Sequence, residues 1–366
     1  MDHLYSRLYG DGLHDDTSAF QALLDASDRS IMIPNGTYLI SRPLQVHDNT
    51  CLCLASGAVM HLADGANCAI IENDALPRRG TNKNIEIHGG IWDGNNQNQV
   101  RRSRESRFAL TQYEEDYYYG IFMRFVGVED LHIHDLTIRN PESYAMLISN
   151  IDRFTVKHIT FDYNMLRPNM DGVHVQGTAR NGRIIDIKGA TNDDLVALNC
   201  DDVYASEITR GNIENVVIDG LFSDNGYTAV RLLSCGSAMK NIAVRNVFGT
   251  YRYYGVSFTH HNVHPGEPIW FDNILVDGVF ASKAAANGGE RPIIWFAKGI
   301  SCGTISLSNI HRLEETVTAA PTIQIDEDVA IDRLRIQNAV QTFTACAPPP
   351  LLVNNGTVKT LIASET

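Results

Sequence analysis

A short pattern of apolar residues returns along the chain from residue 85 onward. Each unit has apolar side chains at its first, third and sixth positions, usually with Asn, Asp or Gly just before the sixth. Clear examples are Leu131/Ile133/Leu136, Phe154/Val156/Ile159, Ile185/Ile187/Ala190, Val216/Ile218/Leu221, Ile242/Val244/Val247, Ile274/Val276/Val279, Ile305/Leu307/Ile310 and Leu334/Ile336/Ala339. From Leu131 onward, successive units start 23 to 32 residues apart. Such a period is typical of solenoids, propellers or arrays.

The repeat predicts one all-β domain over residues 1–366, a single-stranded parallel β-helix. No long helical pattern follows residue 27, which excludes helical repeats, and a propeller would need four strands per blade and a longer repeat. A second short apolar run lies between the units, for example GVHV from Gly172 and LVAL from Leu195. Residues 10–27 predict a Gly-rich entry, an acidic N-cap region at Asp15 to Thr17 and one amphipathic helix, which we expect to cap the open first coil. The irregular segment 97–119 is expected to be an insertion loop.

Composition restricts the partners and the location of the protein. The net charge of −13 argues against nucleic acid or an acidic membrane as a partner. No apolar run reaches the roughly 18 residues of a membrane helix, and the N-terminus has no signal pattern. We expect a cytoplasmic protein if Met1 is the native start, and a secreted or periplasmic one if a signal peptide was removed. The seven cysteines lack zinc-site spacing and are expected to be buried thiols, so neither metal nor cofactor is predicted.

Two of the short runs begin with aspartates that come into register when the runs are aligned. Val173 then falls on Val196, and Asp171 falls on Asp194, with Asp193 just ahead. Neighbouring strands lie roughly 4.8 Å apart, so the carboxylates would be close enough to push their pKa values apart. Acid/base catalysis uses such a group. The alternative is that Asp-Gly and Asn-Asp are ordinary turn formers at strand starts.

Stacking the short strands in register predicts a polar and aromatic face. The outward position is predicted to hold Phe122, Leu147, His174, Ala197, Arg231, Ser257 and Trp295, and two residues before the first inward anchor stand Asp171, Asp194, Thr228 and Tyr254. Aromatic faces, carboxylates and a guanidinium suit a sugar ligand. Trp295 could instead be a core aromatic, and Arg231 could pair with a neighbouring Asp. His260 and His261 predict a substrate site more than a metal site, because adjacent strand residues point in opposite directions.

Several stretches resemble a known superfamily. GDGLHDDTSAFQALLDA followed by IPNGTYLI resembles the opening of pectate-lyase-like right-handed β-helix proteins. NMDGVHV and NDDLVALN resemble the Asn-x-Asp-Gly and Asp-Asp motifs of polygalacturonases, which are inverting glycoside hydrolases. YTAVRLL and TYRYYGVSF resemble that family's strands with a substrate-binding Arg and an active-site Tyr, placing these roles on Arg231 and Tyr254.

The resemblance implies hydrolysis of pectin or a related plant-cell-wall poly- or oligosaccharide, a role in carbohydrate metabolism. Asp193 would be the general acid, and Asp171 with Asp194 would activate the water. The expected substrate contacts are Asn169, His174, Arg231, Tyr254, His260 and Trp295. The chain departs from the family at two points: it lacks the Gly-His-Gly coil, leaving that histidine's role to His174 or His260, and Leu233 replaces a Lys that would contact a uronate.

Two other functions are compatible with the same fold. A polysaccharide lyase or epimerase needs a base beside a charge-neutralised uronate, often with Ca²⁺. A non-catalytic glycan-binding or tailspike-like module would bind sugar without turnover, and substitution of the aspartates would at most alter its binding.

Overall fold

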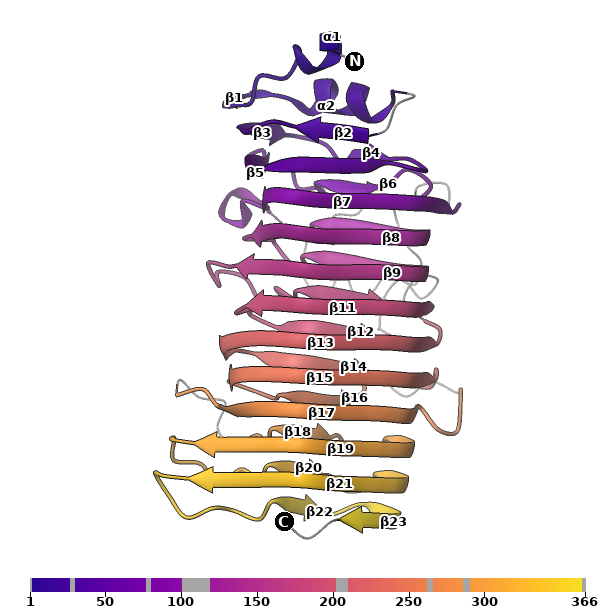
Figure 1. Ribbon diagram of the computed structural model, residues 1–366, viewed down its shortest axis with the longest axis vertical. Helices are drawn as coiled ribbons and strands as arrows, with labels where there is room; N and C mark the ends of the chain where they lie inside the picture. The colour runs from indigo at the N-terminus through magenta and orange to yellow at the C-terminus, as the bar shows by residue number, and fades with distance from the viewer. Residues whose placement is uncertain are drawn as a thin grey trace.

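The chain winds into a single long coil of parallel strands. The computed structural model describes residues 2–26, 30–76, 80–100, 119–201, 210–261, 266–285 and 290–363. The coils stack along one axis from the N-terminus to the C-terminus, in one 23-stranded sheet (Figure 1). This is the parallel β-helix that the repeat predicts, and it is right-handed, as the family resemblance implies. Most of the segment expected as an insertion loop, residues 101–118, lies outside the described residues.

Each complete coil contributes one long and one short strand. The long strands are β5 (Cys51–Leu62), β7 (Asn82–Asp93), β8 (Met123–Arg139), β9 (Met146–Asp162), β11 (Ala179–Gly189), β13 (Ile213–Gly226), β15 (Met239–Tyr251), β17 (Phe271–Lys283), β19 (Ser301–Glu314), β21 (Ala330–Phe343) and β23 (Thr357–Ala363). The short strands are β4 (Leu44–Val46), β6 (Ile71–Asn73), β10 (Val173–Gln176), β12 (Asp194–Asn199), β14 (Thr228–Leu233), β16 (Val256–Thr259), β18 (Ile294–Phe296), β20 (Ile323–Ile325) and β22 (Leu352–Asn354). In the coils of β8 and β9 the short and long segments form one continuous strand.

The repeat unit forms the inward face of the long strands. Ile184 pairs with Val156 on one side and Ile218 on the other, and Ile218 pairs with Val244, so these side chains form one buried column. A residue with positive φ precedes the first inward anchor in four successive coils, from β11 to β17: Asn181, Asn215, Asn241 and Asn273. Asn adopts this conformation more readily than most residues. The Asn amides also bond from coil to coil, at 3.2, 2.9 and 2.8 Å between Nδ2 and Oδ1.

The predicted register is wrong in two strands. In β11 the unit is Gly182/Ile184/Ile187 and not Ile185/Ile187/Ala190, because these residues pair with Phe154/Val156/Ile159. The Phe154 ring fills the space that a Gly182 side chain would need, so an apolar pattern could not reveal this anchor. At the start of β8 the residue aligned with Leu147 is Arg124, and not Phe122. Arg124 pairs with the buried Glu72 carboxylate, which lets a guanidinium occupy a covered position.

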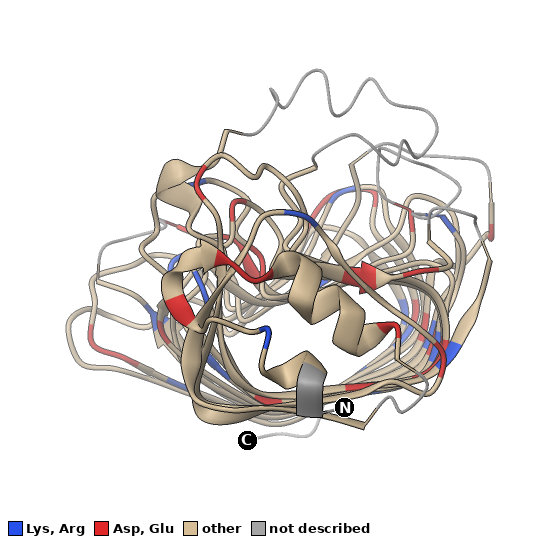
Figure 2. Cartoon of the chain, turned by 90° about the horizontal axis from the view of Figure 1, so that it is seen from above, with Lys and Arg blue, Asp and Glu red and all other residues tan. Residues whose placement is uncertain are grey.

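The first coil is covered by the N-terminal segment, which also contains β1 (Asp11–Asp15), β2 (Ser30–Ile33), β3 (Gly36–Ile40) and the short helix α1 (Asp2–Tyr5). Helix α2 (Thr17–Leu24) lies across the end of the coil when the molecule is viewed along its axis (Figure 2). Phe20, Leu23 and Leu24 are fully buried beneath it, as the sequence predicts. At its N-terminus the Asp16 carboxylate accepts the backbone N–H groups of Tyr9 and Gly10, at 2.6 and 3.2 Å.

The cysteines are less buried than the sequence predicts. All seven cysteines are free thiols, but Cys51, Cys53, Cys68 and Cys346 are only half-buried, so the expectation of buried thiols holds for three of them. A 3₁₀ helix, η1 (Asn96–Asn98), precedes the undescribed segment. Within the described ranges, no helix has the length and apolar character needed to cross a membrane.

Candidate active site

Asp171 and Asp194 lie side by side at the starts of neighbouring strands. β10 and β12 pair in parallel with Val173 opposite Val196, the register that the sequence predicts. The N–H of Gly172 donates to the carbonyl of Asp194 at 2.9 Å, which continues the ladder to the two aspartates. The carboxylates are therefore one rung apart, with Asp193 directly before Asp194 in the preceding turn. One pocket is lined by all three.

The pocket is a hollow of about 310 Å³ on the face of the short strands. Its carboxylate end is formed by the three aspartates with Asn169 and His174, and its other end by side chains from the next three coils. Those later residues include Arg231, Tyr254 and Trp295, so eight of the nine predicted site residues line the same cavity. The further lining residues are Tyr144, Asn199, Tyr227, Thr228, Tyr253, Ser257, Thr259, His261 and Arg291.

The two adjacent aspartates have different surroundings, although both have raised pKa values. Asp194 is 2% exposed, and burial raises its pKa to about 6, against the opposing effect of Arg231. For Asp193, burial raises the pKa well above its usual range, and the neighbouring Asp171 and Asp194 raise it further. The positive charge of Arg231 and the Asn169 amide, which donates to Asp193 Oδ2 at 3.2 Å, counteract only part of this increase in pKa. Asp193 therefore holds its proton more tightly than an ordinary carboxyl group.

His174 is held in place by the Asp171 carboxylate and by a tyrosine ring. Its Nδ1 lies 2.7 Å from Asp171 Oδ2, and the ring stacks on Tyr144 at a centroid distance of 3.9 Å. The Asn199 amide nitrogen donates to Nε2 at 3.1 Å, so Nε2 acts as the acceptor and Nδ1–H donates to Asp171. The other oxygen of Asp171, Oδ1, is buried without a hydrogen-bond partner among the described residues. This oxygen is therefore available to a ligand or a water molecule.

Arg231 reaches the carboxylates from the next coil. It pairs in register with Ala197 of β12, and its Nη1 lies 3.2 Å from Asp194 Oδ2. Its Nε donates to Thr259 Oγ1 at 3.2 Å, which fixes the direction of the guanidinium. Because Arg231 is 25% exposed by its side chain while Asp194 is 3% exposed, one guanidinium can contact both the carboxylate and a ligand. Arg231 can therefore both form an ion pair with a neighbouring Asp and contact a ligand, the two roles that the sequence left open.

Aromatic rings from the coils that follow the aspartates form an aromatic wall of the pocket. Tyr254 stacks on Trp295 at 4.7 Å, and Tyr227 stacks on Tyr253 at 3.9 Å. Arg291 lies over the Tyr253 ring at 4.3 Å and donates to the Tyr254 hydroxyl at 2.9 Å. Half-buried Trp295 donates its indole N–H to Asp326 Oδ2 at 2.8 Å, so it is not a core residue. Rings presented in this way suit contacts with the apolar faces of sugars.

His260 is the one predicted site residue that does not line the pocket. Its Nε2 contacts the Lys298 carbonyl at 2.8 Å, whereas its neighbour His261 faces the cavity. This agrees with the alternation of side chains along a strand. Sequence reasoning missed Tyr144, Tyr227, Tyr253 and Arg291. The tyrosine-rich run at 251–254 was a signal for Tyr253, but Arg291 stands in a loop without a repeat position.

The pocket contains acidic and imidazole groups but no recognised metal-binding cluster. Among the described residues, no set of three or more His, Cys, Asp or Glu side chains has an arrangement that could hold a metal ion. The arrangement can nevertheless carry acid/base chemistry through its own side chains. A protonated carboxyl, an adjacent carboxylate and a neighbouring guanidinium suffice to move a proton and stabilise charge.

Sequence comparisons match the N-terminal part of the chain to a known family. A sequence model of the family described as "Rhamnogalacturonase A/epimerase, pectate lyase-like" matches residues 7–150. A comparison with curated protein sequences gives no match.

Solved structures with the same architecture include both enzymes and an adhesin. A family 28 exopolygalacturonase of Yersinia enterocolitica matches with a TM-score of 0.66 and 14% identity, over 98% of this chain and 77% of that one. A hyperthermoactive exopolygalacturonase of Thermotoga maritima matches with a TM-score of 0.60 and 14% identity, over 98% and 90%. PfbA, a surface adhesin of Streptococcus pneumoniae, matches with a TM-score of 0.58 and 15% identity, over 99% and 92%. At these identities the likeness shows a common fold.

Proposed function

Because the chain belongs by fold to the pectate-lyase-like superfamily of right-handed parallel β-helices, we propose that it is a glycoside hydrolase. Its substrate would be a plant-cell-wall or related poly- or oligosaccharide. The observation that supports this most is the group of three aspartates from two adjacent coils in one pocket lined by aromatic rings. The similarity to exopolygalacturonases is consistent with this reaction, and the residue resemblance assigns the same aspartates to it.

In the proposed reaction Asp193 is the general acid. Its carboxyl proton moves to the glycosidic oxygen as the bond from that oxygen to the anomeric carbon breaks. A water molecule attacks the anomeric carbon from the opposite face and gives its proton to Asp194, with Asp171 also accepting a hydrogen bond from the water. The electron pair of the broken bond stays on the leaving oxygen, and the anomeric configuration inverts.

The surrounding residues support these two roles. The raised pKa of Asp193 favours a protonated acid, while Arg231 keeps part of Asp194 ionised at neutral pH. His174 orients Asp171 by the 2.7 Å contact of its Nδ1. Tyr254, Trp295 and Arg291 would contact the sugar bound beyond the carboxylates, and Asn169 would hold Asp193. Leu233, which replaces the family's Lys, is buried, so the uronate contact that the family makes there is not expected.

A screen of glycan oligomers with detection of new reducing ends tests this proposal. We expect at least one pectic or related oligosaccharide to be cleaved, with reducing ends formed in proportion to bonds broken. The measurement includes ultraviolet absorbance, since a lyase would form an unsaturated uronate at each cleavage. If the absorbance increases with cleavage and the chelator abolishes it, the reaction is elimination by a lyase and not hydrolysis. Binding of an oligosaccharide without any cleavage would favour a glycan-binding module.

An epimerase is the second candidate because the family model that matches residues 7–150 covers epimerases by its description. An epimerase would change the configuration of a sugar ring without forming a reducing end. Proton NMR of the same reaction mixtures detects this change. The loss of substrate signals without new reducing-end signals would support the epimerase and exclude the hydrolase.

A further inference from the structure

Side-chain hydrogen bonds hold the turn that carries Asp193. Thr191 Oγ1 donates to the Asp193 carbonyl at 2.7 Å, which closes the turn locally. Asn192 is held from the preceding coil, because its Nδ2 donates to the Arg167 carbonyl at 2.7 Å. The position of the Asp193 carboxyl group therefore depends on side chains that reach the turn from other coils.

Arg252 reaches the same turn from two coils further along. Its Nη2 donates to the Thr191 carbonyl and to Asn192 Oδ1, both at 3.3 Å. On the way the guanidinium passes over the ring of Tyr227, 5.6 Å from the centroid. The backbone of Arg252 is fixed on the intervening coil, where its N–H donates to the Gly226 carbonyl at 2.7 Å. The Asn192 amide is thus held between Arg167 and Arg252.

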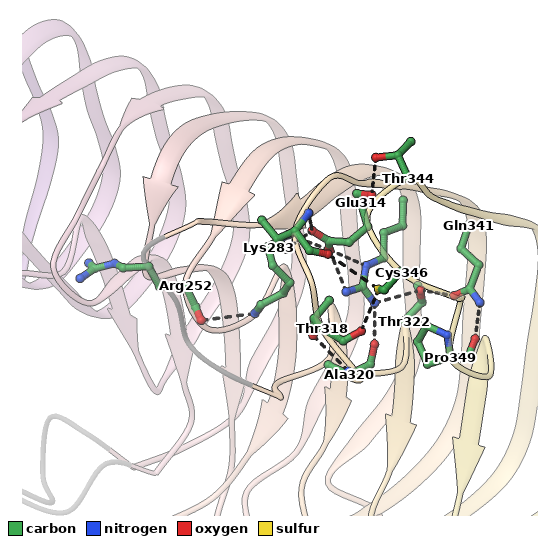
Figure 3. Close-up of polar contacts among 12 residues, drawn as sticks. Arg252, Lys283, Glu314, Thr318, Ala320, Thr322, Gln341, Thr344, Cys346 and Pro349 are labelled. Atoms are coloured by element: carbon green, nitrogen blue, oxygen red, sulfur yellow. Dashed lines mark hydrogen bonds and ion pairs between the residues drawn. The ribbon is translucent and has the colours of Figure 1, made fainter.

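A buried lysine anchors the backbone of Arg252 from the opposite side. Lys283 is 4% exposed, and its ammonium donates to the Arg252 carbonyl at 3.3 Å and to the Tyr253 carbonyl. Figure 3 shows this bond, with the Arg252 guanidinium pointing away from Lys283 toward the earlier coils. The backbone N–H of Lys283 donates to the fully buried Glu314 carboxylate at 3.1 Å, and Arg312 donates to the same carboxylate at 2.8 Å. The Lys283 side chain therefore donates to two backbone carbonyls of the neighbouring coil, those of Arg252 and Tyr253.

We propose that Arg252 is a positioning residue for Asp193, and that Lys283 holds Arg252 in the orientation this requires. The inference rests on the proposed role of Asp193 as the acid. The Arg252 guanidinium lies over the Tyr227 ring and donates to the turn before Asp193. One side chain therefore contacts both the aromatic wall of the pocket and the turn that carries the proposed general acid. Without Arg252 the Thr191 carbonyl loses its partner, and the turn relaxes toward solvent.

Relaxation of the turn has a consequence that a loss of overall stability would not produce. Burial is the main reason that Asp193 holds its proton, so hydration of its carboxyl group lowers the pKa. A structural role of Arg252 in the coil alone would lower the unfolding temperature and leave the titration of Asp193 in the folded protein unchanged.

The test is a titration of the aspartate side-chain carboxyl carbons by ¹³C NMR in the full chain, with the Asp193 signal assigned from its absence in Asp193→Asn. In Arg252→Gln we expect the midpoint of the Asp193 titration to fall by about one pH unit, because hydration of the carboxyl group outweighs the opposite effect of the lost positive charge. Arg245→Gln is the matched control, because Arg245 lies on the same coil, is exposed, and does not line the pocket. Its titration should equal that of the wild type. Arg252→Lys, whose ammonium can reach only one of the two acceptors, should give an intermediate midpoint.

Asn192→Ala gives a second, independent variant, since it removes the contacts with both Arg252 and Arg167. It should lower the Asp193 midpoint in the same direction, and it carries the test if Arg252→Gln does not fold. An Asp193 midpoint that is unchanged in a folded variant overturns the positioning role. The titration needs no turnover, so failure of the wild type to cleave any glycan would refute the proposed function and leave this inference standing. If the wild type does cleave one, Arg252→Gln should reduce kcat more than it changes KM.

Discussion

At the scale of single residues, adjacent aspartates acquire different proton affinities from their neighbours. The Arg231 guanidinium donates directly to Asp194 at 3.2 Å, whereas Asp193 accepts from the Asn169 amide and is affected by Arg231 and two further carboxyl groups through their charges. A cation at hydrogen-bond distance favours ionisation far more than a neutral amide does. The same residue type can therefore serve as base at one position and as acid at the next.

The first prediction is a bell-shaped dependence of the hydrolysis rate on pH. The base Asp194 must be ionised, so activity rises as the pH increases through about 6, the pKa of that group. The acid Asp193 must be protonated, so activity falls again above the raised pKa of Asp193. The measurement is the initial rate of hydrolysis from about pH 4 to about pH 10, with the ionic strength held constant. A rate that is highest at pH 4 would contradict the assignment of Asp194 as base.

The second prediction concerns Arg231→Gln. Arg231 lowers the pKa of Asp194, so its removal should move the acidic side of the pH profile upward by about one unit or more. Unfolding should also become easier by about 3 kcal/mol, because a buried carboxylate loses its ionic partner. The pH profile and a denaturant titration measure the two effects. Arg183→Gln on the exposed surface of β11 is the control and should change neither. An acidic limb that stays in place would exclude this ion pair as the cause.

At the scale of strands and turns, the site depends on how closely two coils approach. A Cβ on Gly172 would lie 2.5 Å from the Phe161 ring and would also clash with the Leu195 carbonyl. Gly172 stands between Asp171 and Val173, and Leu195 follows Asp194. The absence of a side chain at this one position therefore brings the two carboxylates together.

The third prediction follows from that contact. Gly172→Ala should cost about 1–3 kcal/mol of unfolding free energy through overpacking, and should reduce turnover by separating β10 from β12. Circular dichroism with denaturant and a rate assay at 25 °C test both effects together. Gly80→Ala serves as the control, since among the described residues its new methyl group would approach Ala75 alone, at 3.3 Å. Equal activity in the two variants would show that the spacing at Gly172 does not govern the site.

The same elements explain how far the sequence could predict the structure. The register of β10, β12, β14 and β16 follows from inward apolar residues, so Asp171, Asp194 and Arg231 were placed correctly. The pattern failed at Gly182, where the anchor is supplied by the Phe154 ring of the neighbouring coil. The repeat pattern also gave no indication of where Arg291, Arg252 and Lys283 lie. Their positions depend on loops and on contacts across two coils, which have no period in the sequence.

At the scale of the whole molecule, a solenoid needs protection at its open ends. The strand ladder of each coil pairs only with the neighbouring coils, so the first coil would present unpaired strand edges and apolar side chains to solvent. Helix α2 covers that end with Phe20, Leu23 and Leu24, and the Phe20 ring packs edge-on against Tyr38 at 5.7 Å. The helix therefore protects the stack without contributing to the pocket.

The fourth prediction tests this protection. Phe20→Asp removes a fully buried ring and places a carboxylate in the core, so it should cost at least about 3–5 kcal/mol and expose the first coil. Light scattering during size-exclusion chromatography should detect aggregates. Ser18→Asp, on the exposed side of the same helix, should remain as soluble and as stable as the wild type. A soluble and stable Phe20→Asp variant would refute the capping role of α2.

Comparison of Asp193→Asn with the wild type tests the central claim most directly, on an oligosaccharide that the screen identifies. Turnover and binding are measured on the same samples by reducing-end assay and calorimetry. The variant should lose about 10²–10⁴-fold in kcat, because its amide cannot give a proton to the leaving oxygen, while the dissociation constant changes only a few-fold. Turnover equal to that of the wild type would contradict the assignment of Asp193 as the acid and the hydrolytic mechanism built on it.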